Sequence, residues 1–237
     1  MSDDFVSKRY LDHSYLEQNP TWGSEDAKWK MARVKKIFES NNIQPSSICE
    51  VGCGSGAGLA ALRVAYPNVK LVGYDIAPDT KRFWKEYANK NIIFHTADFI
   101  KSEPDHYEII LLLDVLEHVA DPHGFLSGVK AYSDYIVIHF PLDLSALSIL
   151  RETPLLDVRK KVGHIHYFTK RLALELLEEC GLEVIDYHYT GAATSSPQRN
   201  FNSRLFGQFR RLIYFLNKDI GVKLLGGETL MVLAKNK

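Results

Sequence analysis

Cysteine is scarce in this chain, which has only Cys49, Cys53 and Cys180 among its 237 residues. An odd number of cysteines without framework spacing excludes a disulfide scaffold and favours a reducing compartment. Charge of one sign is not in excess either, because 29 Lys and Arg balance 29 Asp and Glu. Since the composition provides no field that would attract nucleic acid, we predict no nucleic-acid partner.

Long apolar runs are also missing. No stretch approaches the roughly 18 residues that a membrane-spanning helix requires. The first ten residues, MSDDFVSKRY, are polar and mixed in charge, unlike a secretory signal. These features predict a cytoplasmic protein with room for one sizeable α/β domain.

What the chain does contain is an alternation of strand-like and helical patterns. Apolar residues recur at helical spacing over residues 26–41. The run YEIILLL (107–113) is apolar without alternation, as expected of a strand buried on both faces of a parallel sheet. Strands are predicted at residues 47–51, 69–75, 91–95, 107–113, 134–140, 182–189 and 228–235. This alternation predicts a doubly wound, mostly parallel sheet.

Four glycines lie close together in CEVGCGSGAG (49–58), directly after the first predicted strand. In open α/β sheets, ligands bind beyond the carboxyl ends of the strands, where such a turn lies. GCGSGA fits the dinucleotide fingerprint G-x-G-x-x-G/A, and Asp75 follows Gly52 by 23 residues, near the usual position of a ribose-binding acid. A nicotinamide-dependent oxidoreductase is therefore one interpretation.

Glu50, immediately before the turn, favours a different ligand. A pyrophosphate is anionic and binds best at a helix N-terminus that has no carboxylate nearby. A carboxylate at this position suits a ligand that carries an ammonium and a sulfonium. S-adenosylmethionine carries both groups, together with a ribose diol for Asp75.

With these motifs the sequence resembles the class I S-adenosylmethionine-dependent methyltransferases, in particular the small-molecule branch related to ubiquinone-biosynthesis methyltransferases. The resemblance is carried by CEVGCGSGAG, VGYDIAP, HTADF, LLLDVLEHVADP and GHIHYFTKRLALELLEECGLEVID. It implies a Rossmann-like sheet of seven strands, mostly parallel with an antiparallel last strand. It also implies S-adenosyl-L-methionine as donor and S-adenosyl-L-homocysteine as product.

The resemblance also assigns cofactor-binding residues. The methionine end and its turn would be formed by Glu50, Gly52, Cys53, Gly54 and Gly56. Asp75 would accept hydrogen bonds from both ribose hydroxyls, and Ile76 would lie against the adenine. Asp98 would accept from the adenine amino group, with Phe99 beside the ring. The floor of the cofactor site would be lined by Asp114 and Val115.

Methyl transfer from a sulfonium is an in-line displacement, so the protein mainly has to position the acceptor. An oxygen acceptor also needs its proton removed, a task that suits histidine. His118 is the first candidate because the methyl group should point toward it, and His139 and His166 are also expected on the acceptor side. His164 shares a strand face with His166, but with no cysteine or carboxylate at ligand spacing we predict no metal.

We predict a single domain over residues 1–237. Its predicted parts are an N-terminal helical cap (1–45), a cofactor-binding core (46–190), an inserted helix (196–226) and the last strand (227–237). Trp22 and Trp29 of the cap could wall the pocket, or could fasten the first long helix to the sheet. The inserted segment 203–218 combines basic and apolar residues, which fits either a lid or an interfacial helix in peripheral membrane contact.

The predicted function is therefore S-adenosylmethionine-dependent O-methylation of a small or lipid-linked acceptor by a monomer or homodimer. Two alternatives stay open. One is a catalytically inactive S-adenosylmethionine-binding scaffold, and the other is the NAD-dependent oxidoreductase.

Overall fold

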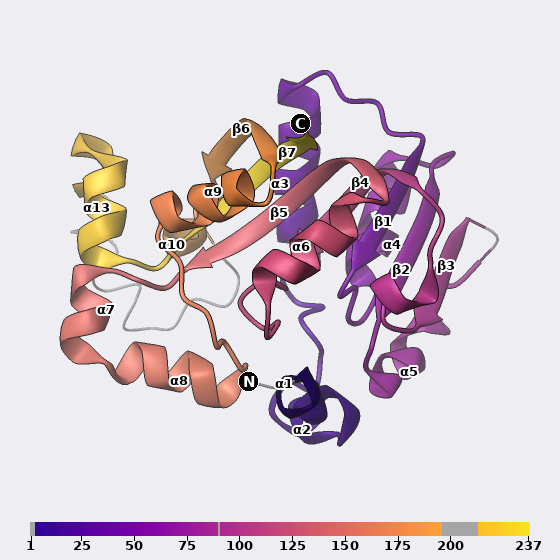
Figure 1. Ribbon diagram of the computed structural model, residues 1–237, viewed down its shortest axis with the longest axis horizontal. Coiled ribbons are helices and arrows are strands. Elements are labelled where there is room, and N and C mark those ends of the chain that lie inside the picture. The colour runs from indigo at the N-terminus through magenta and orange to yellow at the C-terminus, as the bar shows by residue number, and fades with distance from the viewer. Residues whose placement is uncertain (1–2, 90, 196–212) are drawn as a thin grey trace.

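Seven strands form one sheet in the computed structural model, which describes residues 3–89, 91–195 and 213–237 (Figure 1). The strands are β1 (Ser47–Val51), β2 (Lys70–Asp75), β3 (Ile92–Thr96), β4 (Tyr107–Leu113), β5 (Ser133–Leu142), β6 (Leu182–Tyr189) and β7 (Glu228–Asn236). Their order is β3-β2-β1-β4-β5-β7-β6. Only β7 runs antiparallel to its neighbours, β5 and β6. The predicted mostly parallel sheet with an antiparallel last strand is therefore confirmed.

Helices connect the strands. They are α1 (Asp3–Leu11), α2 (Ser14–Gln18), α3 (Ala27–Ser40), α4 (Ala57–Ala65), α5 (Lys81–Trp84), α6 (Pro122–Lys130), α7 (Ala146–Arg151), α8 (Thr153–Lys161), α9 (Lys170–Glu179), α10 (Ala192–Ser195) and α13 (Lys218–Leu225), with 3-10 turns η1 (Pro78–Thr80) and η2 (Ile100–Ser102). Several begin at residues that favour helix starts. Asp121 accepts from the Gly124 amide ahead of α6, and Thr169 accepts from the Leu172 amide ahead of α9.

Between β5 and α9, where helical periodicity alone indicates no element, the structure has α7 and α8. The start of α7 is marked by a capping box, in which Ser145 and Ser148 each accept a hydrogen bond from the other's backbone amide. Pro154 stands in the first turn of α8, a position that proline favours. Both signals were present in the sequence.

The sheet carries a hydrophobic layer on each face. On one face the buried side chains of α6 and α9, including Leu126, Val129 and Leu177, pack on strand residues such as Ile110. On the other face α3 and α4 bury side chains, Phe38 and Leu59 among them, against the alternate strand positions. Because β1, β4 and β5 are covered on both sides, their carboxyl ends emerge from a fully packed support.

The N-terminal region forms a cap. Helices α1 and α2 lie together below the sheet in Figure 1, apart from the helices that flank it. The predicted insertion at 196–226 is described only in part, because residues 196–212 lie outside the described residues. Within the described part, residues 213–216 are helical and α13 follows them. No helix among the described residues is long and apolar enough to cross a membrane.

Candidate active site

The glycine turn after β1 is fastened to the end of β2. The backbone amides of Gly52 and Cys53 both donate to the Tyr74 carbonyl, at 2.8 and 3.0 Å, and the Gly54 amide donates to Asp75 Oδ2 at 2.8 Å. Gly54 has φ +51°, and a Cβ there would lie 2.6 Å from the Trp22 ring. The backbone therefore needs glycine at this position, where the turn meets the cap.

Two buried carboxylates flank this turn. Asp75 accepts from the Gly54 and Ala77 amides, and burial raises its pKa to about 6 against the opposing effect of these bonds. Glu50 has an oxygen with no hydrogen-bond partner, and burial raises its pKa to about 8 although the Lys30 charge acts in the opposite direction. A buried acid without a partner is costly unless a ligand supplies one. Glu50 is therefore placed to receive a cationic group.

The expected adenine side is less completely formed. Ile76 lies at the cavity and is 38% exposed, as a contact surface for a ring would be. Asp98 pairs with Lys101 at 3.2 Å and also accepts from its backbone amide. Phe99 is buried, with its ring edge-on to Tyr74 at 5.1 Å. It reaches the cavity wall from within the core rather than as an exposed stacking surface.

Asp114 directly follows β4 and lines the floor of the cavity beyond the strand ends. It has φ +56°, a rare backbone conformation for a residue other than glycine. Its carboxylate contacts Lys30 Nζ at 2.7 Å and His139 Nδ1 at 2.5 Å. Burial would raise the pKa of Asp114, but His139 and Lys30 outweigh it and hold the pKa well below its usual range. Val115 follows, with a methyl group 2.8 Å from where a Gly52 Cβ would stand.

His139 continues this contact into the sheet. Its Nε2 lies 2.8 Å from the Thr229 hydroxyl, so both ring nitrogens have partners. Lys30, on α3, also contacts Asp26 at 3.1 Å, and these two acids raise the pKa of Lys30 despite its burial. The floor is thus a largely buried network of charged side chains, in which Lys30 and Asp114 keep 18% and 26% of their side-chain surface exposed.

A second cluster lies on the side of the cavity where a methyl acceptor is expected. Ligating atoms of Glu117, His118 and His164 fall within 4.8 Å of one another. The Glu117 carbonyl accepts from the amides of Ile165 and His166, which brings the segment before α9 to the loop after β4. A carboxylate and two imidazoles so close together could hold a divalent ion such as zinc. The sequence analysis missed this set because its members meet only in the folded chain.

The protonation states in this cluster differ. Burial raises the pKa of Glu117 well above its usual value, and neither oxygen has a hydrogen-bond partner. Burial, with His164 nearby, lowers the pKa of His118 to about 3. His164 has a different environment, because its Nδ1 contacts Asp143 Oδ2 at 2.7 Å. Burial therefore favours the protonated form of Glu117 and the neutral imidazole of His118.

One cavity of about 1200 Å³ joins both clusters. Its wall includes Glu50, Asp75 and the contacting pair Asp114 and His139, together with His118 and His164. His166 is not among the described residues that line it, and its Nε2 has no hydrogen-bond partner. Sequence reasoning also missed Lys30, Glu117 and Asp143. Only Glu117 carried a signal, as part of the motif LLLDVLEHVADP.

The cap closes this cavity with aromatic rings. Tyr15 lies between Tyr10 and Trp22, with ring centroids 5.0 and 4.8 Å away. His13 contacts Asp79 at 2.7 Å on the side where the adenine is expected. On the other side, Arg9 donates to the backbone carbonyls of Lys160 and Lys161 at the end of α8. Trp22 and Trp29 both line the cavity, as predicted for pocket walls.

The doubly wound sheet and the glycine turn flanked by two acids are typical of α/β proteins that bind a nucleotide-like ligand beyond the carboxyl ends of their strands. Comparison with known proteins narrows this class. A family model described as "Methyltransferase domain" matches residues 24–187. The chain therefore belongs to this methyltransferase family, whose domain uses S-adenosylmethionine.

Curated relatives are similar over part of the chain. Ubiquinone biosynthesis O-methyltransferase of Glaesserella parasuis serovar 5 (strain SH0165) is 26% identical over 108 residues, 39% of this chain and 42% of that protein. The enzyme of the same name from Hydrogenovibrio crunogenus (strain DSM 25203 / XCL-2) is 28% identical over 108 residues, 41% and 44% of the two chains. The match thus spans about two fifths of these relatives.

Solved structures share the fold. The methyltransferase in complex with the Haloferax volcanii Trm112 methyltransferase activator has a TM-score of 0.64 at 15% identity, covering 99% of this chain and 97% of that one. Magnesium protoporphyrin IX methyltransferase from Synechocystis PCC 6803, with bound SAH, has a TM-score of 0.58 at 14% identity, covering 89% and 83%. At these identities the likeness concerns the fold alone.

Proposed function

We propose that this chain transfers the methyl group of S-adenosylmethionine to the oxygen of a small or lipid-linked acceptor. The observation that carries the proposal is the pair of buried acids beside the glycine turn. Glu50 would face the ammonium of the methionine moiety, and Asp75 would accept from the ribose hydroxyls through its remaining lone pairs. A nicotinamide dinucleotide would instead bring its pyrophosphate to the same turn, beside Glu50.

The other cofactor contacts follow from this placement. Gly52, Cys53, Gly54 and Gly56 would let the backbone approach the methionine moiety, and Lys30 would supply a cation for its carboxylate. Ile76, Asp98 and Phe99 would surround the adenine, while Asp114 and Val115 would form the floor. Lys30 is the buried cation among the described residues that line the methionine end of the cavity.

Deprotonation of the acceptor hydroxyl belongs to the histidine side of the cavity, for which the sequence suggests His118, His139 and His166. We favour His164 as the base, because Asp143 holds its Nδ1 and leaves Nε2 toward the cavity side occupied by Glu117 and His118. His139 has both ring nitrogens engaged. His118 would serve as a neutral hydrogen-bonding partner of the acceptor.

Oxygen as the attacking atom and a lipid-linked acceptor are supported by the curated relatives, which are named as ubiquinone biosynthesis O-methyltransferases. A cytoplasmic site of action is supported by the three cysteines, all of them free. The segment 203–218, predicted to be a lid or an interfacial helix, lies outside the described residues up to 212. A monomer or homodimer stays a prediction.

The proposal is tested by incubating the full chain with S-adenosylmethionine carrying a labelled methyl group and a metabolite and lipid extract of the native host. We expect labelled product together with S-adenosylhomocysteine, and denaturing mass spectrometry of co-purified ligand then identifies the acceptor. Binding of S-adenosylhomocysteine without any methyl release would instead support the inactive scaffold.

A further inference from the structure

Exposed apolar side chains gather on one side of the molecule. Of the fifteen large apolar side chains that are exposed in the described part of the chain, eight belong to α7, α8, α13 and residues 213–216. They are Leu147, Ile149, Leu150, Leu156, Phe215, Leu216, Ile220 and Leu224. We call them the α7–α13 face. Three of them are almost fully open to solvent, with Leu150 84%, Phe215 87% and Leu216 74% exposed.

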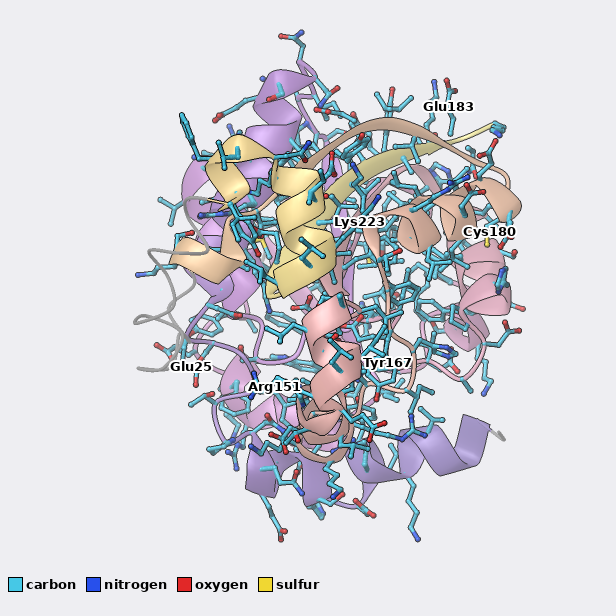
Figure 2. All side chains as sticks on the ribbon, turned by 90° about the vertical axis from the view of Figure 1, so that its left-hand side faces the viewer. Glu25, Arg151, Tyr167, Cys180, Glu183 and Lys223 are labelled. Carbon is cyan, nitrogen blue, oxygen red and sulfur yellow. The ribbon has the colours of Figure 1, made fainter. Side chains whose placement is uncertain are left out.

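Packing explains why these residues share a side. Helix α13 packs against α7, and Figure 2 shows both helices toward the viewer, with Arg151 and Lys223 on this side. Helix α13 turns Gly221 and Val222 inward, which leaves Ile220 and Leu224 outside. This region thus presents apolar groups to solvent instead of the polar surface usual for a helix at the protein surface.

Positive charge surrounds the apolar groups. Helices α7, α8 and α13 contain six Lys and Arg against two Asp, and Glu152 between α7 and α8 adds one more acid. These helices and Glu152 together carry a net charge of +3, although the formal net charge of the whole chain is zero. Among described residues, Arg151, Arg159, Lys160, Lys161 and Lys223 form no salt bridge, whereas Lys218 pairs with Glu228 and Asp219 with Lys170.

We propose that the α7–α13 face docks on the surface of a bilayer that contains anionic lipids. Apolar side chains flanked by Lys and Arg suit the interface, where the former enter the acyl boundary and the latter meet lipid phosphates. Each basic residue near such a surface contributes roughly 1 kcal/mol. A second copy of the chain fits less well, because pairing two such faces would bring two positive surfaces together.

Docking would also orient the cavity. Helix α8 runs from this face to the acceptor end, where Val158 and Val162 line the cavity just before His164. If the acceptor is lipid-linked, as the proposed function allows, docking through this face would bring the end of the cavity lined by Val158 and Val162 near the membrane. The docking of this face can be tested without methyl transfer, because the experiment measures binding of the protein to lipid vesicles.

The test is co-sedimentation of the full chain with phosphatidylcholine vesicles and with vesicles that also contain phosphatidylglycerol, at low and high salt. We expect binding to the anionic vesicles at low salt, weakened at high salt. The double variants Leu150→Ser/Phe215→Ser and Arg151→Glu/Lys223→Glu should each lose this binding. Val64→Ser, at an 85% exposed position on α4, and Lys85→Glu, at an exposed position after α5, are matched controls that should bind as the parent does.

Two results would overturn the proposal. One is a protein that stays in the supernatant with anionic vesicles at low salt. The other is a dimer in light scattering that dissociates in Leu150→Ser/Phe215→Ser, which would assign the face to a second copy. Titration with S-adenosylhomocysteine keeps the two proposals apart, since every face variant should bind it as tightly as the parent. A failure of vesicle binding with intact ligand binding would remove this inference and leave the proposed function standing.

Discussion

The proposed cofactor end of the cavity, at Glu50 and Asp75, and the proposed acceptor end, at Glu117 and His164, are constructed in different ways. At the cofactor end, backbone amides of the glycine turn bond to the end of β2, and Glu50 and Asp75 stand on adjacent strands. At the acceptor end, side chains from the loop after β4, the segment after β5 and the segment before α9 meet in one cluster. The first end is fixed by sheet register, whereas the second depends on loops packing together.

Their electrostatics differ as well. The cofactor end holds acids that burial leaves ready for a cation or hydroxyl donors, with pKa values of about 8 for Glu50 and about 6 for Asp75. At the acceptor end, burial raises the pKa of Glu117 well above its usual value and lowers the pKa of His118 to about 3. We infer that the first end is specific for one charged ligand and the second for a neutral, hydrogen-bonding acceptor. Changes at the first end should therefore act on S-adenosylhomocysteine binding, and changes at the second on turnover.

The largest effect on S-adenosylhomocysteine binding should come from Gly54→Val, at the cofactor end. A branched side chain there would meet the Trp22 ring, take the space of the methionine moiety and oppose the positive φ. We expect no detectable S-adenosylhomocysteine binding by calorimetry, while circular dichroism still shows a folded protein. Gly181→Val is the matched control, because Gly181 also has a positive φ, +72°, but follows the end of α9 and does not line the cavity. This variant should be less stable and should still bind S-adenosylhomocysteine. An unfolded Gly54→Val chain would make that glycine mainly structural.

The acceptor end should respond to His164→Asn. Loss of a general base lowers turnover by roughly 10²–10⁴-fold, while S-adenosylhomocysteine affinity should stay unchanged. Asp143→Asn should act through the same histidine, so the double variant should lose little more than His164→Asn alone. Methyl release and calorimetry measure the two effects, with His123→Asn, an exposed histidine paired with Glu179, as control. Equal turnover in His164→Asn and the parent would exclude His164 as the base.

Asp75→Ala should have a moderate effect. The ribose hydroxyls would lose a charged acceptor, and the Gly54 amide would lose its partner, so binding of S-adenosylhomocysteine should weaken by about 1–3 kcal/mol. Asp105→Asn provides a control at an exposed acid that pairs with Lys70. Affinity that is the same as in the parent would remove Asp75 from the ligand site.

The smallest effect concerns pH and Glu50. Because its folded pKa of about 8 lies above its usual value near 4.5, the free protein keeps this acid protonated at neutral pH. Stability from this group is present at low pH and is lost as pH rises through about 8. An ammonium partner would ionise it, so S-adenosylhomocysteine binding should release a proton and tighten between pH 7 and about 8.

Glu50→Gln should flatten this pH dependence, bind S-adenosylhomocysteine more weakly and unfold at a higher temperature than the parent at alkaline pH. Calorimetry in buffers of different ionisation enthalpy measures the affinity and the proton released on binding. Thermal melts across pH measure the unfolding temperature. A pH dependence that survives in Glu50→Gln would assign the proton to another group.

The sequence was sufficient to predict the sheet and to locate the glycine turn and Asp75 at its strand ends, because these depend on local patterns. The buried strand β4 and the edge strand β6 both have the predicted bounds, and the glycine turn and Asp75 belong to short motifs. The acceptor end was harder, since contacts such as Asp143 with His164 arise from loops that no periodicity describes. The sequence pattern indicates only that Lys30 belongs to an amphipathic helix. Its role appears when α3 brings it to Asp114.

We expect the β1–β2 end of the sheet to accept an S-adenosyl ligand and to exclude a dinucleotide. Calorimetric titration of the full chain with S-adenosylhomocysteine, and separately with NAD, tests it most directly. The account predicts saturable binding of S-adenosylhomocysteine, weakened in Asp75→Ala, and no binding of NAD. Saturable NAD binding, or no binding of S-adenosylhomocysteine by the folded parent, would contradict it.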